Sequence, residues 1–279
     1  MVRRVRVGIV APGTRLDPSV AERVTALAAA RHPEVELYVH PQCQMSSGHF
    51  AGPDAARIAA FVEIANDASF DAVWFGRGGY GSCRVAEAAL PKLNDAARRK
   101  TYLGYSDAGV LLAGLYARGF QGVAHGPMPA DITRDGGDEA VARALAYLSN
   151  RPADSLEPSI APGRKAIAFN MIILSQLLGT PLQPDLTDHV LMLEEVSEYM
   201  YRIDRTLFHL TSTPAIRRVA GIRLGRCSAI PPNEPDFGQT EVEIVEHWSR
   251  LSGIPYLGRA DIGHDAANKI VPFGAPRVA

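Results

Sequence analysis

Residues 101–119, TYLGYSDAGVLLAGLYARG, decide the fold class of this chain. The short run TYLG is followed within a few residues by VLLAGLYARG, which is long enough for a helix. A strand that turns sharply into a helix produces this pattern, and Ser106 occupies the turn. The segment therefore predicts one βα unit of a parallel sheet, with a serine at the carboxyl end of its strand.

The same alternation surrounds this segment. Helical patterns separate the strand candidates RVRVGIVA, VELYVH, DAVWF and GVAHG. This rhythm predicts an N-terminal parallel-sheet α/β domain over residues 1–150 that carries a nucleophile elbow. A proline-rich stretch over residues 151–165 predicts a linker. The less regular pattern over residues 166–279 predicts a smaller C-terminal domain of α/β or β-rich type.

Composition excludes several classes of protein. The 279 residues are 47% hydrophobic, which is enough to fill a substantial core. The 29 basic and 30 acidic residues nearly cancel, so we expect no binding to nucleic acid or to anionic membranes. No run approaches the roughly 18 to 20 apolar residues that cross a bilayer. Three widely spaced cysteines suit a reducing compartment, so we expect a cytoplasmic protein.

Ser106 has two interpretations. As a nucleophile it needs an exposed hydroxyl, a base and donors for the oxyanion, and a strand-to-helix turn supplies the first and third, with the amide of Asp107 as one donor. GYSDAG nearly matches the GxSxG elbow, with Ala108 in place of the second glycine. Alternatively, Ser106 or Asp107 caps the following helix. The segment alone leaves both open.

The glycine loop, residues 76–81 (GRGGYG), follows a strong strand candidate. Gly78 and Gly79 let the backbone approach a ligand and present amide donors. The loop lacks the GxxxxGK[ST] pattern, so it predicts an oxyanion or carboxylate site rather than a nucleotide site. A purely structural turn is the alternative.

Several residues are candidates for the general base and for the carboxylate that orients it. His125 and His264 both stand beside glycine in apparent loops, and periodicity does not choose between them. Glu194, Glu195 and Glu198 follow an apolar strand, either as partners for a histidine or as a solvated acidic loop. No HxH, HExxH or CxxC pattern occurs, so we expect neither a metal nor a cofactor.

The chain resembles the LD-carboxypeptidase (muramoyltetrapeptide carboxypeptidase) family of serine peptidases over nearly its entire length. The resemblance depends on an ordered set of segments: RGGYG, GYSDAG, HGPM, GTPLQPDLTDHVLMLEEVSEYMYRIDR and GHDAANKIVPFGA. It implies a catalytic triad of Ser106, Glu194 and His264, with the serine on the N-terminal domain and the other two on the C-terminal domain. It also implies that the amides of Asp107 and Gly79 bind the oxyanion.

The implied reaction removes terminal D-alanine from peptidoglycan tetrapeptides in cell-wall recycling, and a homodimer is implied too. Arg77 is the nearest basic candidate for the terminal carboxylate of the muropeptide substrate. Two departures from the family pattern affect the cleft: Gly109 stands where the family often has Thr, and residues 168–170 are AFN rather than GGN.

Three other functions compete with this prediction. The first is a microcin-immunity-type peptidase that cleaves peptidyl or aminoacyl nucleotides. The second is a non-catalytic peptide-binding module in which Ser106 is only a cap. A metal-dependent carboxypeptidase is the third.

Overall fold

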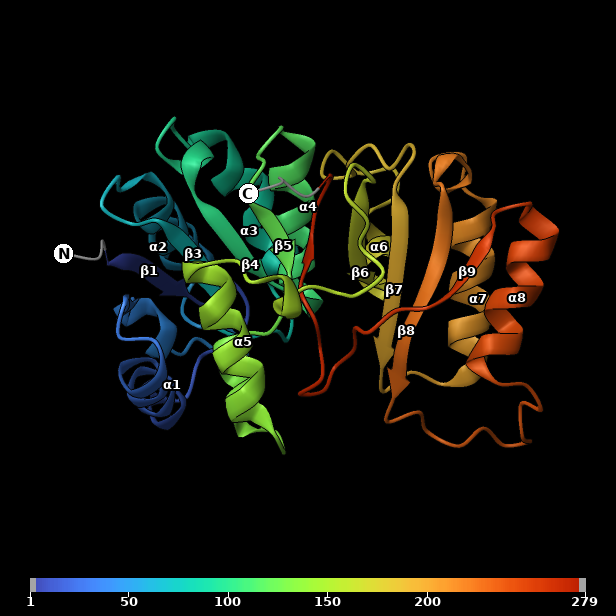
Figure 1. Ribbon diagram of the computed structural model, residues 1–279, viewed down its shortest axis with the longest axis horizontal. Coiled ribbons are helices and arrows are strands. Elements are labelled where there is room, and N and C mark those ends of the chain that lie inside the picture. Colours follow the sequence, from blue (N-terminus) through green and yellow to red (C-terminus); the bar gives the residue numbers. More distant parts are fainter. Residues whose placement is uncertain (1–3, 276–279) are drawn as a thin grey trace.

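The computed structural model describes residues 4–275 and places two sheets side by side, one mostly and one wholly parallel, each covered by helices (Figure 1). Residues 1–3 and 276–279, at the outer ends of the two predicted domains, lie outside the described residues. The α/β class predicted from the sequence is confirmed, and the C-terminal part is α/β rather than β-rich.

The first sheet has the strand order β10-β5-β4-β3-β1-β2. Strands β1 to β5 pair in parallel, and only β10 runs antiparallel, beside β5. Because parallel strands share one carboxyl edge, the loops after them gather along that edge. The strands are β1 (Val5–Val10), β2 (Val35–Val39), β3 (Ala72–Phe75), β4 (Thr101–Gly104), β5 (Val123–His125) and β10 (Val271–Pro272).

Helices cover both faces of this sheet. Buried residues of α2, α3 and α4 form one core with the sheet, and those of α1 and α5 form another on the opposite face. Trp74 and Phe75 in β3 are fully buried, one in each core, as expected for a parallel sheet covered on both faces. The helices are α1 (Pro18–Arg31), α2 (Asp54–Asn66), α3 (Ser82–Ala89), α4 (Gly109–Ala117) and α5 (Gly137–Ser149).

The second sheet has the order β6-β7-β8-β9, with all neighbours parallel. Its helices α6, α7 and α8 pack together, and their buried residues join the core that contains α4. Thr240 and Glu243 form a capping box that starts α8. The elements are β6 (Ala166–Asn170), β7 (Val190–Val196), β8 (Gly221–Ser228), β9 (Tyr256–Arg259), α6 (Met171–Leu177), α7 (Met200–Ser212) and α8 (Glu241–Ser252).

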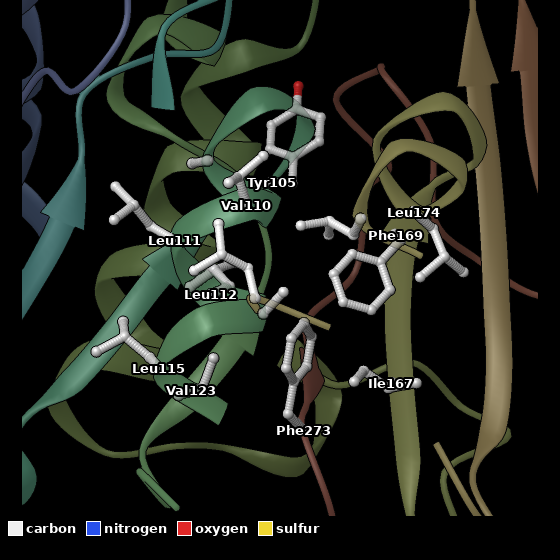
Figure 2. Packing of buried hydrophobic residues seen from close by; sticks show 14 of the residues in the cluster. Tyr105, Val110, Leu111, Leu112, Leu115, Val123, Ile167, Phe169, Leu174 and Phe273 are labelled. Atoms are coloured by element: carbon white, nitrogen blue, oxygen red, sulfur yellow. The ribbon is translucent and has the colours of Figure 1, made fainter. Parts of the chain in front are cut away.

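The last strand joins the two halves. β10 pairs with β5, and just beyond it Gly274 exchanges backbone hydrogen bonds of 3.1 and 2.9 Å with Ala166 of β6. Figure 2 shows Phe273 packed between α4 and β6, where it contacts the ring of Phe169. The predicted division at residues 150 and 166 stays a prediction, but residues 271–272 return to the first sheet.

Among the described residues, no helix is both long enough and apolar enough to cross a bilayer.

Candidate active site

Ser106 stands in a strained turn between β4 and α4. Its φ of 56° lies in the left-handed region, which costs a non-glycine residue about 1–2 kcal/mol. A Cβ on Gly104 would lie 2.9 Å from Phe75 and 3.3 Å from the Cβ of Ala108, so only glycine fits there. The capping interpretation is wrong, because α4 has Ala108 as its N-cap residue and no side chain caps its amides.

The carboxylate of Asp107 connects this turn to the glycine loop. It accepts hydrogen bonds from the amides of Gly81, at 3.2 Å, and Ser82, at 2.9 Å, where α3 begins. Burial raises the pKa of Asp107, and these hydrogen bonds oppose that shift. Asp107 therefore holds the glycine loop beside Ser106 through its side chain.

The glycine loop approaches Ser106 closely. A Cβ on Gly78 would lie 3.0 Å from the Ser106 hydroxyl oxygen, and Thr14 donates a 2.9 Å hydrogen bond to the Gly78 carbonyl. Gly79 has a φ of 110°, and a Cβ there would lie 2.7 Å from the Thr14 hydroxyl oxygen. The amide of Gly79 donates to none of the described residues, which leaves it available to a ligand.

His264 and Glu194 form a buried pair. Nδ1 of His264, in the loop between β9 and β10, lies 2.5 Å from Oε2 of Glu194 on β7. Burial alone would lower the pKa of His264, but the charge of Glu194 and this hydrogen bond outweigh it and raise the pKa. The ring of Tyr105 lies 4.8 Å from the His264 ring. This bond fixes the imidazole and leaves Nε2 for another partner.

The other two carboxylates of the acidic segment do not contact the histidine. Glu195 accepts hydrogen bonds from Asn170 Nδ2, at 2.6 Å, and from the amide of Ile172, at 3.1 Å, at the start of α6. Burial raises the pKa of Glu195 to about 7. Glu198 forms an ion pair with Arg202 in the first turn of α7.

His125 is buried behind the site. Its Nε2 lies 3.2 Å from the amide oxygen of Asn268, and burial lowers its pKa to about 4. The same oxygen of Asn268 accepts a 3.2 Å hydrogen bond from the amide of Gly263, next to His264. His125 therefore supports the loop that carries His264 and does not line the cavity described next.

A cavity of about 430 Å³, called here the site cavity, opens beside these groups. Its lining includes five residues that the sequence singled out: Arg77, Gly78, Gly79, Ser106 and His264. The hydrogen-bonded chain expected from the resemblance is only half formed, since no hydrogen bond joins Ser106 to His264 within residues 4–275. The described part of the chain also holds no group of three or more His, Cys, Asp or Glu side chains suited to a metal ion.

Both halves of the chain match known family models. Residues 7–126 match the LD-carboxypeptidase N-terminal domain, and residues 165–277 match the C-terminal domain. A Synechocystis protein named as a carboxypeptidase is 32% identical over 237 residues, which are 82% of this chain and 76% of that protein. The chain belongs to the LD-carboxypeptidase family.

Other LD-carboxypeptidase relatives match over most of their length. The murein tetrapeptide carboxypeptidase of Pseudomonas aeruginosa is 25% identical, covering 98% of this chain and 92% of that protein. The structure of the Oxalobacter formigenes muramoyltetrapeptide carboxypeptidase has a TM-score of 0.81 at 22% identity, covering 97% of this chain and 93% of that chain.

A structure of the microcin C7 self-immunity protein has a TM-score of 0.78 at 17% identity, covering 98% of this chain and 92% of that chain. At identities below 25%, the likeness to this structure and to the Oxalobacter formigenes structure shows the fold alone. The fold therefore does not separate the two reactions weighed from the sequence.

The two departures of this LD-carboxypeptidase from the family pattern meet in space. A Cβ on Gly109 would lie 3.5 Å from the ring of Phe169 and 3.3 Å from Ile173. The phenylalanine of the AFN segment thus occupies the space beside position 109. We therefore expect the absent side chain at 109 and the large one at 169 to compensate each other in volume.

Sequence reasoning missed three residues of the cavity wall: Tyr105, Asp131 and Arg134. Arg134 Nε donates to Asp131 at 2.8 Å, and the Tyr105 hydroxyl donates to the same carboxylate at 2.7 Å. The usable signal was position. Residues 126–134 follow β5 at the same carboxyl edge as the serine turn, although the sequence patterns singled out only His125, the last residue of β5, as a candidate there.

Proposed function

We propose that this LD-carboxypeptidase family member is a serine carboxypeptidase that removes terminal D-alanine from muramoyl tetrapeptides. In this proposal Ser106 is the nucleophile, His264 the general base and Glu194 the residue that orients it. One observation carries the proposal: the strained serine turn and the imidazole held by Glu194 line the same cavity. The name of the Pseudomonas aeruginosa relative supports the choice of substrate.

The reaction proceeds by acyl transfer. Nε2 of His264 takes the Ser106 proton as the hydroxyl oxygen attacks the carbonyl carbon before D-alanine. The amides of Asp107 and Gly79 bind the oxyanion that forms. The protonated His264 then donates its proton to the leaving amine, which departs as D-alanine. A water molecule attacks the acyl-enzyme while His264 takes its proton, and His264 then returns this proton to the Ser106 oxygen as the ester bond breaks and the tripeptide acid leaves.

The fully buried position of Glu194 supports its proposed role. An imidazolium that forms during the reaction places a positive charge against this carboxylate in a medium of low dielectric constant, where the attraction is strong. The Ser106–His264 hydrogen bond forms when substrate binds, because catalytic hydrogen bonds are often loose in ligand-free enzymes.

The proposal extends to the cellular role and assembly. We propose action in cell-wall recycling, a cytoplasmic location and a homodimer. Cys43, Cys83 and Cys227 are all free thiols, which agrees with a reducing compartment. Light scattering of the purified protein tests the homodimer, and a mass of one chain would exclude it.

Incubation with a muramoyl tetrapeptide that ends in L-lysyl-D-alanine tests the reaction. Mass analysis should show the loss of one alanine with the wild-type protein and no loss with Ser106→Ala. If an aminoacyl nucleotide is cleaved while the tetrapeptide stays intact, the microcin-immunity-type function replaces this one. If neither compound is cleaved and both bind, the chain is a binding module.

A further inference from the structure

We infer that Arg134 binds the free terminal carboxylate of the substrate and thereby restricts the enzyme to removing one residue. The inference rests on the proposed function and adds a specificity determinant to it. A carboxypeptidase must distinguish a chain end from an internal peptide bond, and the carboxylate is the group that differs. A guanidinium is the side chain best suited to bind it, through two parallel hydrogen bonds.

Arg134 is held in place by the carboxylate of Asp131, which accepts three hydrogen bonds. Oδ1 of Asp131 accepts hydrogen bonds from Arg134 Nε, at 2.8 Å, and from the Tyr105 hydroxyl, at 2.7 Å. Oδ2 of Asp131 accepts one from the amide of Met128, at 2.8 Å. Three donors therefore share the charge of Asp131, which is buried. The guanidinium is fixed by its Nε side rather than by its outer end.

The outer end of the guanidinium is available for a ligand. Nη2 lies 3.5 Å from the Tyr105 hydroxyl, at the limit of a hydrogen bond, and Nη1 has no partner among the described residues. The Arg134 side chain is 39% exposed and lines the site cavity together with Ser106 and His264. Its two outer nitrogens present the fork of donors that a carboxylate accepts.

Arg134 and His264, the base of the proposed reaction, both lie close to Tyr105. Tyr105 lies between the two groups: its ring is 4.8 Å from the ring of His264, and its hydroxyl approaches Arg134. In the proposed reaction His264 protonates the nitrogen of the departing D-alanine. That nitrogen and the carboxylate carbon are bonded to the same α-carbon, so the carboxylate lies within a few ångströms of the imidazole, in the cavity that Arg134 also lines.

The other arginine of the cavity is less suited to this role. Arg77 is exposed, and its Nη1 makes one hydrogen bond, of 3.4 Å, to the carbonyl of Arg15. No carboxylate pairs with it within residues 4–275. Binding through Arg77 would have to order a long side chain, whereas Asp131 has already ordered Arg134.

Two substrates that differ only at the chain end test the inference: the tetrapeptide acid and its C-terminal carboxamide. We measure kcat/KM for each from the tripeptide product that they share. Arg134→Gln keeps an amide donor for Asp131 but loses the charged fork. It should lower kcat/KM for the acid about 100-fold, as expected for charge-assisted hydrogen bonds, and change the value for the carboxamide by less than about 3-fold.

Two further variants sharpen the test. Arg202→Gln is the matched control, because the Arg202 side chain is 42% exposed, pairs with the carboxylate of Glu198 four residues earlier and does not line the site cavity. Both substrates should be unaffected. Arg134→Lys keeps a charge without the fork, so it should lower kcat/KM for the acid about 10-fold. If Arg134→Gln does not fold, the acid-to-carboxamide ratio of Arg134→Lys decides.

The outcomes separate the inference from the proposed function. Equal losses on both substrates in Arg134→Gln would overturn the inference and make Arg134 a positioning residue. Loss of discrimination in Arg77→Gln instead would assign the carboxylate to Arg77. A wild-type protein that cleaves acid and carboxamide equally well would leave the proposed function intact and refute the inference. A wild-type protein that cleaves neither refutes the proposed function, and the inference with it.

Discussion

Replacement of Gly109 by the threonine that is common in the family should destabilise this chain. The backbone at Gly109 has a φ of −53°, so no conformational reason requires glycine. The reason is space: a Cβ would lie 3.3 Å from Ile173 and 3.5 Å from Phe169, and threonine adds two more heavy atoms beyond it. Overpacking of this kind costs about 1–3 kcal/mol of the free energy of unfolding.

The partner variant is Phe169→Ala, which empties the space opposite. Phe169 is 1% exposed and contacts Phe273, so truncation should cost about 3–5 kcal/mol. In the double variant the threonine side chain occupies part of the cavity. The double variant should therefore be more stable than the sum of the two single effects by about 1–3 kcal/mol.

Urea unfolding of the four proteins measures this coupling energy. A value within about 0.5 kcal/mol of zero would refute the argument, because independent sites add to within that error. Gly109→Ala serves as a control. It adds only the Cβ and gains helix propensity of up to about 1 kcal/mol, so it should lose little or no stability. A loss as large as that of the threonine variant would show that the space already excludes the Cβ, and that the two further atoms of threonine are not what decides.

Four further predictions concern the chemistry and its pH dependence. Ser106→Ala and Ser106→Gly should each lose about 10³-fold or more in kcat/KM, while Ser106→Gly alone gains about 1 kcal/mol in unfolding free energy from its φ of 56°. Because Glu194 raises the pKa of His264 against the effect of burial, kcat/KM should rise with pH through a midpoint above about 6.5, and Glu194→Gln should lower that midpoint. The raised pKa of His264 in the folded protein stabilises the fold below about pH 6.5, and this stabilisation is lost as the pH rises through the raised pKa. The destabilisation caused by Glu194→Gln should therefore become smaller as the pH rises. Full activity should persist in a chelator, and loss of activity that zinc restores would support the metal-dependent alternative.

The parts of the site that the sequence predicts are those formed by local structure. The serine turn depends on a strand, a glycine and a helix within residues 101–117, and each leaves a pattern in the sequence. The glycine loop is equally local, since backbone close to a neighbouring strand end requires glycine. These features were visible without knowledge of how distant segments meet.

Local sequence patterns did not identify the carboxylate that pairs with His264. β7 is buried over most of its length, so alternation does not tell which face Glu194 and Glu195 occupy. The resemblance alone favoured Glu194. In the structure, Glu195 accepts a hydrogen bond from the backbone amide of Ile172 at the start of α6. Of the two carboxylates, only Glu194 contacts His264.

Arg134 was missed for a related reason. β5 is only three residues long, and ADITR after it has the composition of an ordinary loop. Arg77 attracted attention because glycines surround it, which is a local property. Arg134 is suited to bind a ligand because Asp131 and Tyr105 hold its side chain in place. The contact with Tyr105 spans 29 residues of sequence, so no local pattern reveals it.

The position of His264 depends on how the chain ends. The loop that carries it leads into β10, which pairs antiparallel with β5 through Val271 and His125. Gly274 then bonds to Ala166 at the edge of the second sheet. The loop that carries His264 therefore leads into a strand of the sheet that contains the Ser106 turn. Its partner Glu194 lies on β7, in the second sheet. Because β10 and the residues just after it bond to both sheets, the distance between Ser106 and His264 depends on the packing at this junction. If these two residues are the nucleophile and the base, as proposed, we expect substitutions at Gly109 and Phe169, which lie in the same junction, to change activity as well as stability.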